Sequence, residues 1–467
     1  MYARFVKFTW AILLPLIFLS LAGCAQLGIR PGRDNLNKDR QIALALPVTG
    51  SHANIVKKIV QGAKCAYQEE VARGVNLNLV VLDTSQKDWL KRLASLPKNC
   101  AVVGGPLDLP TYKKIKQANL LENRVFYPFL SRLEGYDEGQ LAYRFFPSAN
   151  DQAEALVDFA NKKLKITSFG AFYPTDNYSQ GMVKTFEQSL QRRHLPLKKA
   201  TYDGSMPATW AKSAKDLINP SIPEFGGTPV PTTSFDAVFL PASWKHLDQL
   251  IGSFMANGED RLVLMGTLVW EQSLAGAKFA KPQRFELAIF PGAWNNKIVL
   301  PAQAGKNDFW VSLGYDFVKF ASHLNLDAKP SHLEIIDRSN YATRFIRSLA
   351  PITFDDTGHM HQKLFIYRLS ANGMVQVDPV FFNQVRTTRK ANAAMRFQSV
   401  STPTTIEDIS APASGSIGDD LNPKPTLPQL AEPKPVRKAP VGILGTVPQS
   451  SHKLRLPTQR PANPAEF

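Results

Sequence analysis

Apolar and polar positions alternate in blocks along most of the chain, and each block has the length and spacing of one secondary-structure element. Ile42 to Leu46 form a short continuous apolar run, which is typical of a buried parallel strand, and Pro47 ends it. Apolar residues at helical spacing follow from Ile55, so a helix is predicted there, with Thr49 or Ser51 as its cap. The free N–H groups of that first turn favour a polar or anionic group, which makes the turn a candidate ligand edge.

The same succession of strand and helix continues to about residue 324, and it restarts once, near residue 147. This pattern predicts two α/β units, each with a parallel sheet covered by helices on both faces and with functional loops at the carboxyl ends of its strands. Further predicted strands are 76–83, 100–105, 124–131, 165–174, 197–204, 235–241, 261–267 and 285–294, and further predicted helices are 86–96, 110–119, 179–193, 209–217, 244–255 and 309–324.

Five stretches of the sequence carry a family resemblance when they are taken in order. They are IALALPVTGSHANIVKKIVQGAKCA from Ile42, RFFPSANDQAEAL from Arg144, GAFYPTDNYSQGMVKTFEQSL from Gly170, FDAVFLPASWKHLDQLI from Phe235 and FDDTGHMHQKLFIYRLSANGMVQV from Phe354. Together, over residues 40–377, they resemble the type I periplasmic binding proteins, the leucine/isoleucine/valine-binding superfamily.

The resemblance implies a type I periplasmic binding fold, in which two doubly wound parallel-sheet lobes are joined by three crossovers, near Pro147, Pro291 and Ile352. Such lobes close by hinge motion over a ligand that lies in the cleft between them. Lobe one would comprise residues 40–146 and 291–351, and lobe two residues 147–290 and 352–385.

The resemblance also implies where a ligand would lie. In amino-acid-binding members, hydroxyl side chains and backbone N–H groups after the third and fourth strands hold the ligand carboxylate, and an acid from lobe two holds the ammonium group. This sequence departs from that pattern, because Leu107 and Asp108 stand where a hydroxyl residue is expected and Glu271 is the one acid that can be nominated. A free α-amino acid is therefore disfavoured, and the aromatic residues either stack on a larger or less charged ligand or pack between the lobes. The implied cleft residues are Thr49, Ser51, Asp108, Ser131, Tyr173, Tyr178, Ser243, Thr267 and Trp270.

The amino terminus has the layout of a secretory leader that ends in a cysteine. Arg4 and Lys7 precede an apolar run, and Leu21 to Cys24 read Leu-Ala-Gly-Cys. This ending resembles the lipobox of bacterial lipoproteins, which implies a signal peptide over 1–23, lipidation of Cys24 and a tether over 24–39.

The lipobox places the protein in the bacterial cell envelope, anchored by acyl chains and facing the periplasm. Ala25 follows the cysteine, whereas Asp at that position retains enterobacterial lipoproteins in the inner membrane. The outer membrane is therefore favoured.

Composition adds a basic surface and an unusual tail. Lys and Arg number 55 against 39 acidic residues, a formal net charge of +16, and 44% of the residues are hydrophobic, enough for a large globular body. In the periplasm, such charge fits anionic lipid headgroups, anionic envelope polymers or an acidic partner, and no nucleic acid is expected; it could equally serve solubility alone. Twelve of the 34 prolines fall in residues 401–467, which are predicted to form a disordered tether or partner-binding tail.

Two cysteines remain besides Cys24. Cys65 lies on the first predicted helix and Cys100 lies just before a predicted strand, and these elements are neighbours in a doubly wound unit. An even pair in an oxidising compartment predicts a disulfide, with two buried free thiols as the alternative.

The remaining motifs do not indicate an enzyme. The sequence has no G-x-S-x-G, H-E-x-x-H or C-x-x-C motif, so no catalytic residue, metal or cofactor is assigned. His359 and His361 have ligand-like spacing, but a solvent-facing hairpin also explains this pair. Glu69 and Glu70 are adjacent acids that are expected to be solvated.

Two functional hypotheses follow. In the first, the chain binds a small polar molecule in the interlobe cleft for an ABC importer or a sensor. In the second, the same fold is an interaction module that transports nothing, similar to the outer-membrane lipoproteins that activate a peptidoglycan synthase (penicillin-binding protein). The cleft topology favours the first hypothesis. Ala25, the altered carboxylate site, the proline-rich tail and the basic body favour the second.

Overall fold

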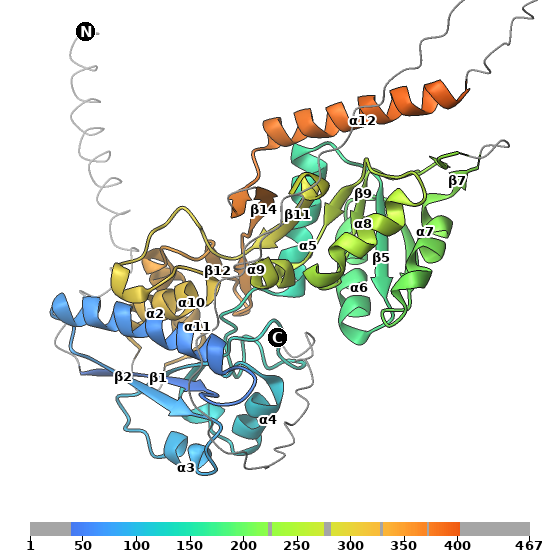
Figure 1. Ribbon diagram of the computed structural model, residues 1–467. Coiled ribbons are helices and arrows are strands. Elements are labelled where there is room, and N and C mark those ends of the chain that lie inside the picture. The colour runs from blue at the N-terminus through green and yellow to red at the C-terminus, as the bar shows by residue number, and fades with distance from the viewer. Residues whose placement is uncertain (1–38, 223–226, 275–281, 327–329, 371–372, 402–467) are drawn as a thin grey trace, which may run out of the picture. The chain divides into compact units, whose positions relative to one another are not determined.

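The computed structural model describes residues 39–222, 227–274, 282–326, 330–370 and 373–401 (Figure 1). The predicted leader, the lipidation site Cys24, nearly all of the tether and the proline-rich tail beyond residue 401 lie outside these residues. Among the described helices, none combines the length and the apolar character that a bilayer crossing requires.

The first sheet is parallel and has four strands in the order β2-β1-β3-β4. Ile42 and Leu44 of β1 point into the core on one face, and the small residues Ala43 and Ala45 point into the core on the other, because successive strand residues alternate in direction. The strands are β1 (Arg40–Leu46), β2 (Leu77–Asp83), β3 (Val102–Gly104) and β4 (Val125–Tyr127).

Helices cover both faces of this sheet. One face packs against α2, α10 and α11, and the opposite face packs against α3 and α4 (Figure 1). These helices are α2 (Ala53–Ala72), α3 (Trp89–Ala94), α4 (Leu109–Gln117), α10 (Phe309–His323) and α11 (His332–Ala342).

The second sheet has seven strands in the order β15-β14-β11-β10-β9-β5-β6. The neighbouring strands β6, β5, β9, β10 and β11 are parallel to one another. Strands β14 and β15 add an antiparallel hairpin at the edge beside β11. The strands are β5 (Phe169–Pro174), β6 (Leu197–Tyr202), β9 (Ala237–Phe239), β10 (Val263–Met265), β11 (Ala288–Gly292), β14 (Phe365–Ser370) and β15 (Gly373–Gln376).

Helices also cover both faces of the second sheet. On one face lie α7 and α8, and on the other α5 and α6 together with the start of α12. Two parallel-rich sheets with helices on both faces confirm the predicted α/β fold class. These helices are α5 (Ala149–Asp158), α6 (Asn177–Gln191), α7 (Trp210–Ile218), α8 (Leu247–Met255) and α12 (Pro379–Ser401).

Short elements complete the described chain. They include α9 (Leu268–Leu274), the strand pair β7 (Pro220–Ser221) and β8 (Val230–Pro231), the π-helical turn η2 (Phe159–Lys163), and the 3-10 turns η1 (Leu121–Asn123), η3 (Pro207–Thr209), η4 (Trp244–His246), η5 (Pro282–Phe285), η6 (Ala302–Ala304) and η7 (Thr343–Phe345).

The hairpin of β12 (Ile352–Phe354) and β13 (Met360–Gln362) packs on the first sheet's core, whereas the predicted division places residues from 352 onward in lobe two. The Phe354 ring lies 6.4 Å from the Tyr127 ring and 6.2 Å from the Phe320 ring. Alternation of apolar and polar residues turns one face of the hairpin onto this core, and the chain joins the second sheet only at β14.

Helices α2 and α10 touch closely because each has a glycine at the contact. A Cβ atom on Gly62 would lie 2.0 Å from the Val311 carbonyl oxygen, and one on Gly314 would lie 1.9 Å from the Ile59 carbonyl oxygen. Residues 309–322 of α10 are all buried, so over this span the helix has no solvent-exposed face.

Glu69 and Glu70, predicted to be solvated, instead link α2 to α10. Glu70 is 1% exposed, and its Oε1 accepts a hydrogen bond from Lys319 Nζ at 2.6 Å. Glu69 Oε2 accepts a hydrogen bond from the Tyr315 hydroxyl at 2.7 Å. The sequence reasoning missed this link because Lys319 lies about 250 residues further along the chain.

The predicted disulfide between Cys65 and Cys100 is wrong. Both thiols are free and buried, and they belong to different cores: Cys65 on α2 faces one side of the first sheet and Cys100 faces the other. The sheet itself separates the two sulfur atoms, which a disulfide would have to hold at bonding distance.

We therefore expect the melting temperature of the mature chain to be the same with and without a reducing agent. A chain that carries Cys24→Ser should show two reactive thiols when it is denatured without reductant, and none before denaturation, because both sulfur atoms are buried. Absence of reactive thiols in the denatured chain would overturn this assignment.

Candidate functional site

Asp83 holds the polar turn that follows β1. Its Oδ1 accepts hydrogen bonds from the Val48 and Ser85 backbone N–H groups, both at 3.0 Å, and Oδ2 accepts one from Gln86 Nε2 at 3.0 Å. Burial opposes the charge, but these bonds and one from the Ser85 hydroxyl outweigh it and lower the pKa of Asp83 to about 2. The sequence alone did not identify Asp83. In the structure it pairs with Leu46 in the parallel register of β1 and β2, which places its carboxylate beside the turn after β1.

Thr49 and Ser51 lie on this turn, and both are exposed. The Thr49 hydroxyl donates to the Ser85 Oγ at 2.8 Å, and the Ser51 Oγ lies 3.2 Å from His52 Nδ1. Neither caps the helix: α2 begins after His52, whose side chain makes no capping hydrogen bond. The prediction of Thr49 or Ser51 as the cap was wrong because the turn is bound to Asp83 and not to the helix.

Asp108, after β3, caps helix α4. Its Oδ1 accepts from the Thr111 backbone N–H at 2.8 Å, and its Oδ2 accepts from the Thr111 hydroxyl at 2.9 Å. Both carboxylate oxygens therefore serve the helix start. Ser131 follows β4 and is half-buried, so the structure brings one predicted hydroxyl residue to the ends of the third and fourth strands.

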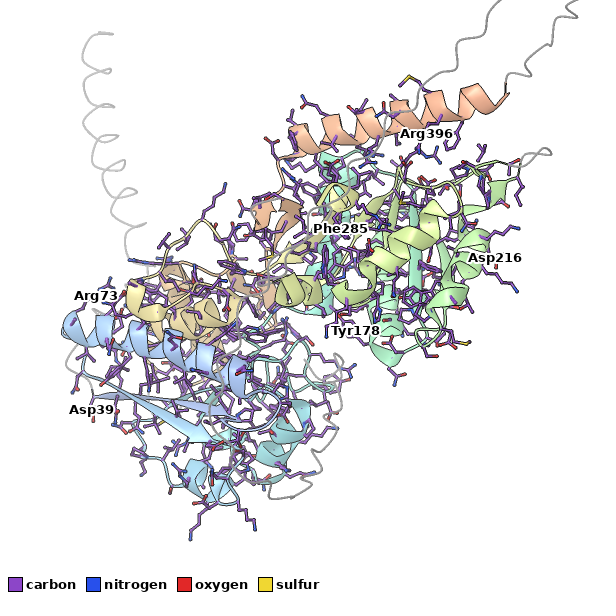
Figure 2. The ribbon with its side chains drawn as sticks, in the orientation of Figure 1. Asp39, Arg73, Tyr178, Asp216, Phe285 and Arg396 are labelled. Atoms are coloured by element: carbon purple, nitrogen blue, oxygen red, sulfur yellow. The ribbon has the colours of Figure 1, made fainter. Side chains whose placement is uncertain are left out.

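At the strand ends of the second sheet, Tyr173 and Tyr178 (the latter labelled in Figure 2) are half-buried, and Thr267 is fully buried. The Tyr178 hydroxyl donates to Thr267 Oγ1 at 3.2 Å. Burial raises the pKa of Tyr178 to about 12, so its hydroxyl stays neutral at physiological pH. The structure thus joins two of the predicted residues in one hydrogen bond that faces inward.

Trp270 is a core residue and not a cleft residue. Its side chain is fully buried, and its indole N–H donates to the Ala242 carbonyl oxygen at 2.8 Å. Its ring lies 5.3 Å from that of Trp244, and a Cβ atom on Gly266 would lie 2.0 Å from it. The prediction failed because α9 starts directly after β10 and turns this ring back beneath Gly266. Ser243, on the neighbouring loop, accepts from the Lys245 backbone N–H at 3.4 Å and caps η4.

Glu271, the acid nominated for an ammonium group, is also enclosed. It is 3% exposed, and neither carboxylate oxygen has a hydrogen-bond partner of normal geometry among the described residues. Burial raises the pKa of Glu271 well above its ordinary value, and the nearby Ala293 N–H opposes this only in part.

We expect Glu271→Gln to gain stability relative to the unsubstituted chain as pH rises. The folded-state pKa lies above the unfolded value, so the native state loses stability once pH passes the unfolded pKa, by about 1.4 kcal/mol for each unit of the shift. Urea midpoints at pH 5 and pH 8 measure this. An equal difference between variant and unsubstituted chain at both pH values would contradict a raised pKa.

A buried network around Arg144, which the sequence did not reveal, ties the passages between the sheets together. Arg144 is 3% exposed, its Nε donates to Glu138 Oε1 at 2.9 Å, and its guanidinium also donates to the carbonyl oxygens of Phe146 and Met360. Asp151 lies 3.5 Å from the guanidinium. The network therefore joins the first passage to β13.

Asp151 extends the network in two directions. With Ser148 it forms a reciprocal capping box at the start of α5, and its Oδ1 accepts from the Gln362 backbone N–H at 3.2 Å. Gln362 Nε2 in turn donates to the Ala350 carbonyl oxygen at 3.0 Å. The spacing of Ser148 and Asp151 is the one part of this network that sequence could have flagged.

A groove of about 800 Å³ lies beside this network, between α5 and the hairpin strands β12 to β15. Its lining mixes apolar side chains such as Phe159 and Val377 with charged ones such as Lys163 and Lys363. This groove contains none of the predicted cleft residues.

His359 and His361 both lie next to Asp355 on the β12–β13 hairpin. His361 Nε2 is 3.1 Å from Asp355 Oδ2, and His359 Nδ1 is 3.9 Å from Oδ1. Within the described ranges, no group of three or more metal-ligating side chains occurs.

Comparison with known proteins identifies the fold. No family model and no curated protein matches the sequence. A putative branched-chain amino acid ABC transporter protein from Rhodospirillum rubrum superposes with a TM-score of 0.54 at 12% identity, over 73% of this chain and 100% of that one.

Two further solved structures are similar at a TM-score of 0.50 and 14% identity. One is the C-domain of LpoA from Haemophilus influenzae, a regulator of PBP1A, which covers 72% of this chain and 100% of its own. The other is an ABC transporter substrate-binding protein from Desulfitobacterium hafniense in complex with Leu, at 73% and 100%. The chain therefore has the type I periplasmic binding fold that its sequence predicted.

Proposed function

From this type I periplasmic binding fold, we propose that the chain is an envelope lipoprotein that works as a protein-interaction module and regulates a peptidoglycan synthase. One observation carries the proposal: three polar side chains that would recognise an amino acid, Asp108, Thr267 and Glu271, are bonded or enclosed within the fold itself. This reverses the order in which the sequence ranked the two hypotheses.

Recognition of a free amino acid requires an accessible acid and accessible hydroxyl groups. Glu271 is buried with a raised pKa, so it offers no charge to an ammonium group. Both carboxylate oxygens of Asp108 accept hydrogen bonds from the first turn of α4. Thr267 is fully buried and accepts a hydrogen bond from Tyr178. A site without these contacts loses the buried polar pairing that gives such ligands their affinity.

A protein-interaction module binds its partner through an accessible surface and does not require a closed polar pocket. The groove between α5 and β12–β15 supplies mixed apolar and charged side chains over about 800 Å³. The same fold occurs in the LpoA C-domain, a regulator of PBP1A, which supports a peptidoglycan synthase as the partner.

The proposal includes the anchor that the sequence predicts. Lipidation at Cys24 would hold the module at the periplasmic side of the outer membrane, where a synthase that spans the periplasm can be reached. Without Arg4 and Lys7 of the leader, the formal net charge is 55 − 2 − 39 = +14, which suits an anionic or acidic counterpart in that compartment.

A second candidate, capture of a larger and less charged solute, is favoured by Tyr173 and Tyr178. Both rings are half-buried at the strand ends of the second sheet, where they could stack on a ligand.

Two measurements on the mature chain with Cys24→Ser separate these candidates. A small ligand at a hundredfold over its dissociation constant adds about 2.7 kcal/mol of stability, so amino acids, peptides and muropeptides are screened for a rise in melting temperature. Capture of a purified peptidoglycan synthase is measured in parallel. We expect capture without any thermal shift, and a shift with no capture would replace the proposal with the solute-binding candidate.

A further inference from the structure

Helices α3 and α4 form the outer layer on one face of the first sheet (Figure 1), and their exposed surface is basic. Six exposed basic side chains on and beside these helices make no ion pair with any described residue, and Asp39, Asp88 and Glu122 are exposed acids near them. The six are Lys87, Lys91, Arg92, Lys98, Lys114 and Arg132, and we call this surface the α3–α4 face.

Other acids near the α3–α4 face are neutralised by ion pairs. Lys113 Nζ lies 2.8 Å from Glu134 Oε1, and Lys116 Nζ lies 2.7 Å from Asp137 Oδ1. These pairs fasten the loop after β4 onto α4, and they leave the unpaired basic side chains in excess.

The same loop presents Tyr136 to solvent. Tyr136 is 93% exposed, and it stands between Glu134 and Asp137, whose ion pairs fix the loop on both sides of it. A fully exposed aromatic ring with a polar tip, beside basic side chains, is the combination that suits the interface between a membrane and water.

The first described residue after the predicted lipid anchor, Asp39, lies beside the α3–α4 face. Strand β1 starts directly after Asp39, whose Oδ2 accepts from Asn99 Nδ2 at 2.9 Å, next to Lys98 (Figure 2). The 15 residues from Cys24 to Lys38 can span at most about 55 Å, so lipidation would keep the start of β1 within that distance of the bilayer.

We propose that the α3–α4 face, with Tyr136 at its edge, docks on anionic phospholipid headgroups. The inference rests on the lipid anchor in the proposed function and adds the surface that faces the membrane. Electrostatic attraction to the headgroups strengthens binding about fivefold for each basic residue that reaches the surface, and salt screens it.

The test uses the mature chain with Cys24→Ser, which has no acyl chain, and vesicles of phosphatidylcholine with or without phosphatidylglycerol. We expect binding to the anionic vesicles alone, weakened by salt. Lys87→Gln, Lys91→Gln and Lys114→Gln combined should lower the partition coefficient on the order of a hundredfold, and Tyr136→Ser should lower it several-fold. The matched control combines Lys184→Gln, Lys212→Gln and Lys245→Gln, three exposed lysines around the second sheet, and should stay within about twofold of the unsubstituted chain.

Equal binding to both kinds of vesicle, or an equal loss in the control, would overturn the proposal.

Synthase capture is measured on the same variants. If the three substitutions on the α3–α4 face abolish capture while vesicle binding is unchanged, the face belongs to an acidic protein partner and the lipid proposal fails. Failure of the proposed function is a separate outcome, because there the unsubstituted chain captures no synthase at all.

Discussion

Arg144→Met is expected to lower the free energy of unfolding by about 3–5 kcal/mol, the range seen when one partner of a buried ion pair is removed. The guanidinium is 3% exposed and donates to Glu138 and to the carbonyl oxygens of Phe146 and Met360. Its loss leaves two carbonyl oxygens without this donor, and it leaves the Glu138 carboxylate, 13% exposed, with the Met360 backbone N–H as its remaining described donor. Urea unfolding followed by tryptophan fluorescence measures the change.

The control for this substitution is Arg192→Met. The Arg192 side chain is 52% exposed and pairs with Glu154, which keeps Arg193 as a second partner. Because exposed ion pairs contribute little, this variant should lose about 0.5 kcal/mol. If the two arginine variants lose the same free energy of unfolding, the buried network around Arg144 contributes no more to stability than an exposed ion pair.

Lys319→Met should be similarly damaging, with a loss of about 3 kcal/mol. Lys319 is 2% exposed and its ammonium group lies 2.6 Å from both Glu69 Oε2 and Glu70 Oε1. Glu70 is 1% exposed, so it cannot recover its charge interaction from water once the lysine is gone. The same urea experiment reports the loss.

Arg73→Met is the matched control for Lys319. Arg73 also pairs with Glu70, at 3.3 Å, but its side chain is 50% exposed. We expect a loss below about 1 kcal/mol, because solvent screens this contact. Comparable losses for Lys319→Met and Arg73→Met would show that burial does not decide the strength of these pairs.

The sequence predicted the elements of the fold because their signal is local. The apolar run of β1 and the helical spacing of α2 are visible within about thirty residues, and the order of such elements was enough to identify two parallel-rich sheets. The start of α2 was misassigned because its neighbour Asp83, on another strand, binds the turn.

What failed depends on contacts between distant segments. The Cys65–Cys100 disulfide required both residues on one face of the sheet, and sequence order does not say which face a helix covers. Trp270 looked accessible because it follows a strand end, yet the close turn at Gly266 buries it. Lys319 and Arg144 lie in buried networks whose partners are up to 250 residues away, which no periodicity reveals.

We propose that the chain acts on a protein and not on a small solute. The most direct measurement is the rate at which a purified peptidoglycan synthase polymerises its lipid-linked precursor, with and without the mature chain. We expect a faster rate when the chain is present, and we expect added free leucine to leave that rate unchanged. An unchanged rate, together with a rise in the chain's melting temperature on addition of an amino acid, would contradict it.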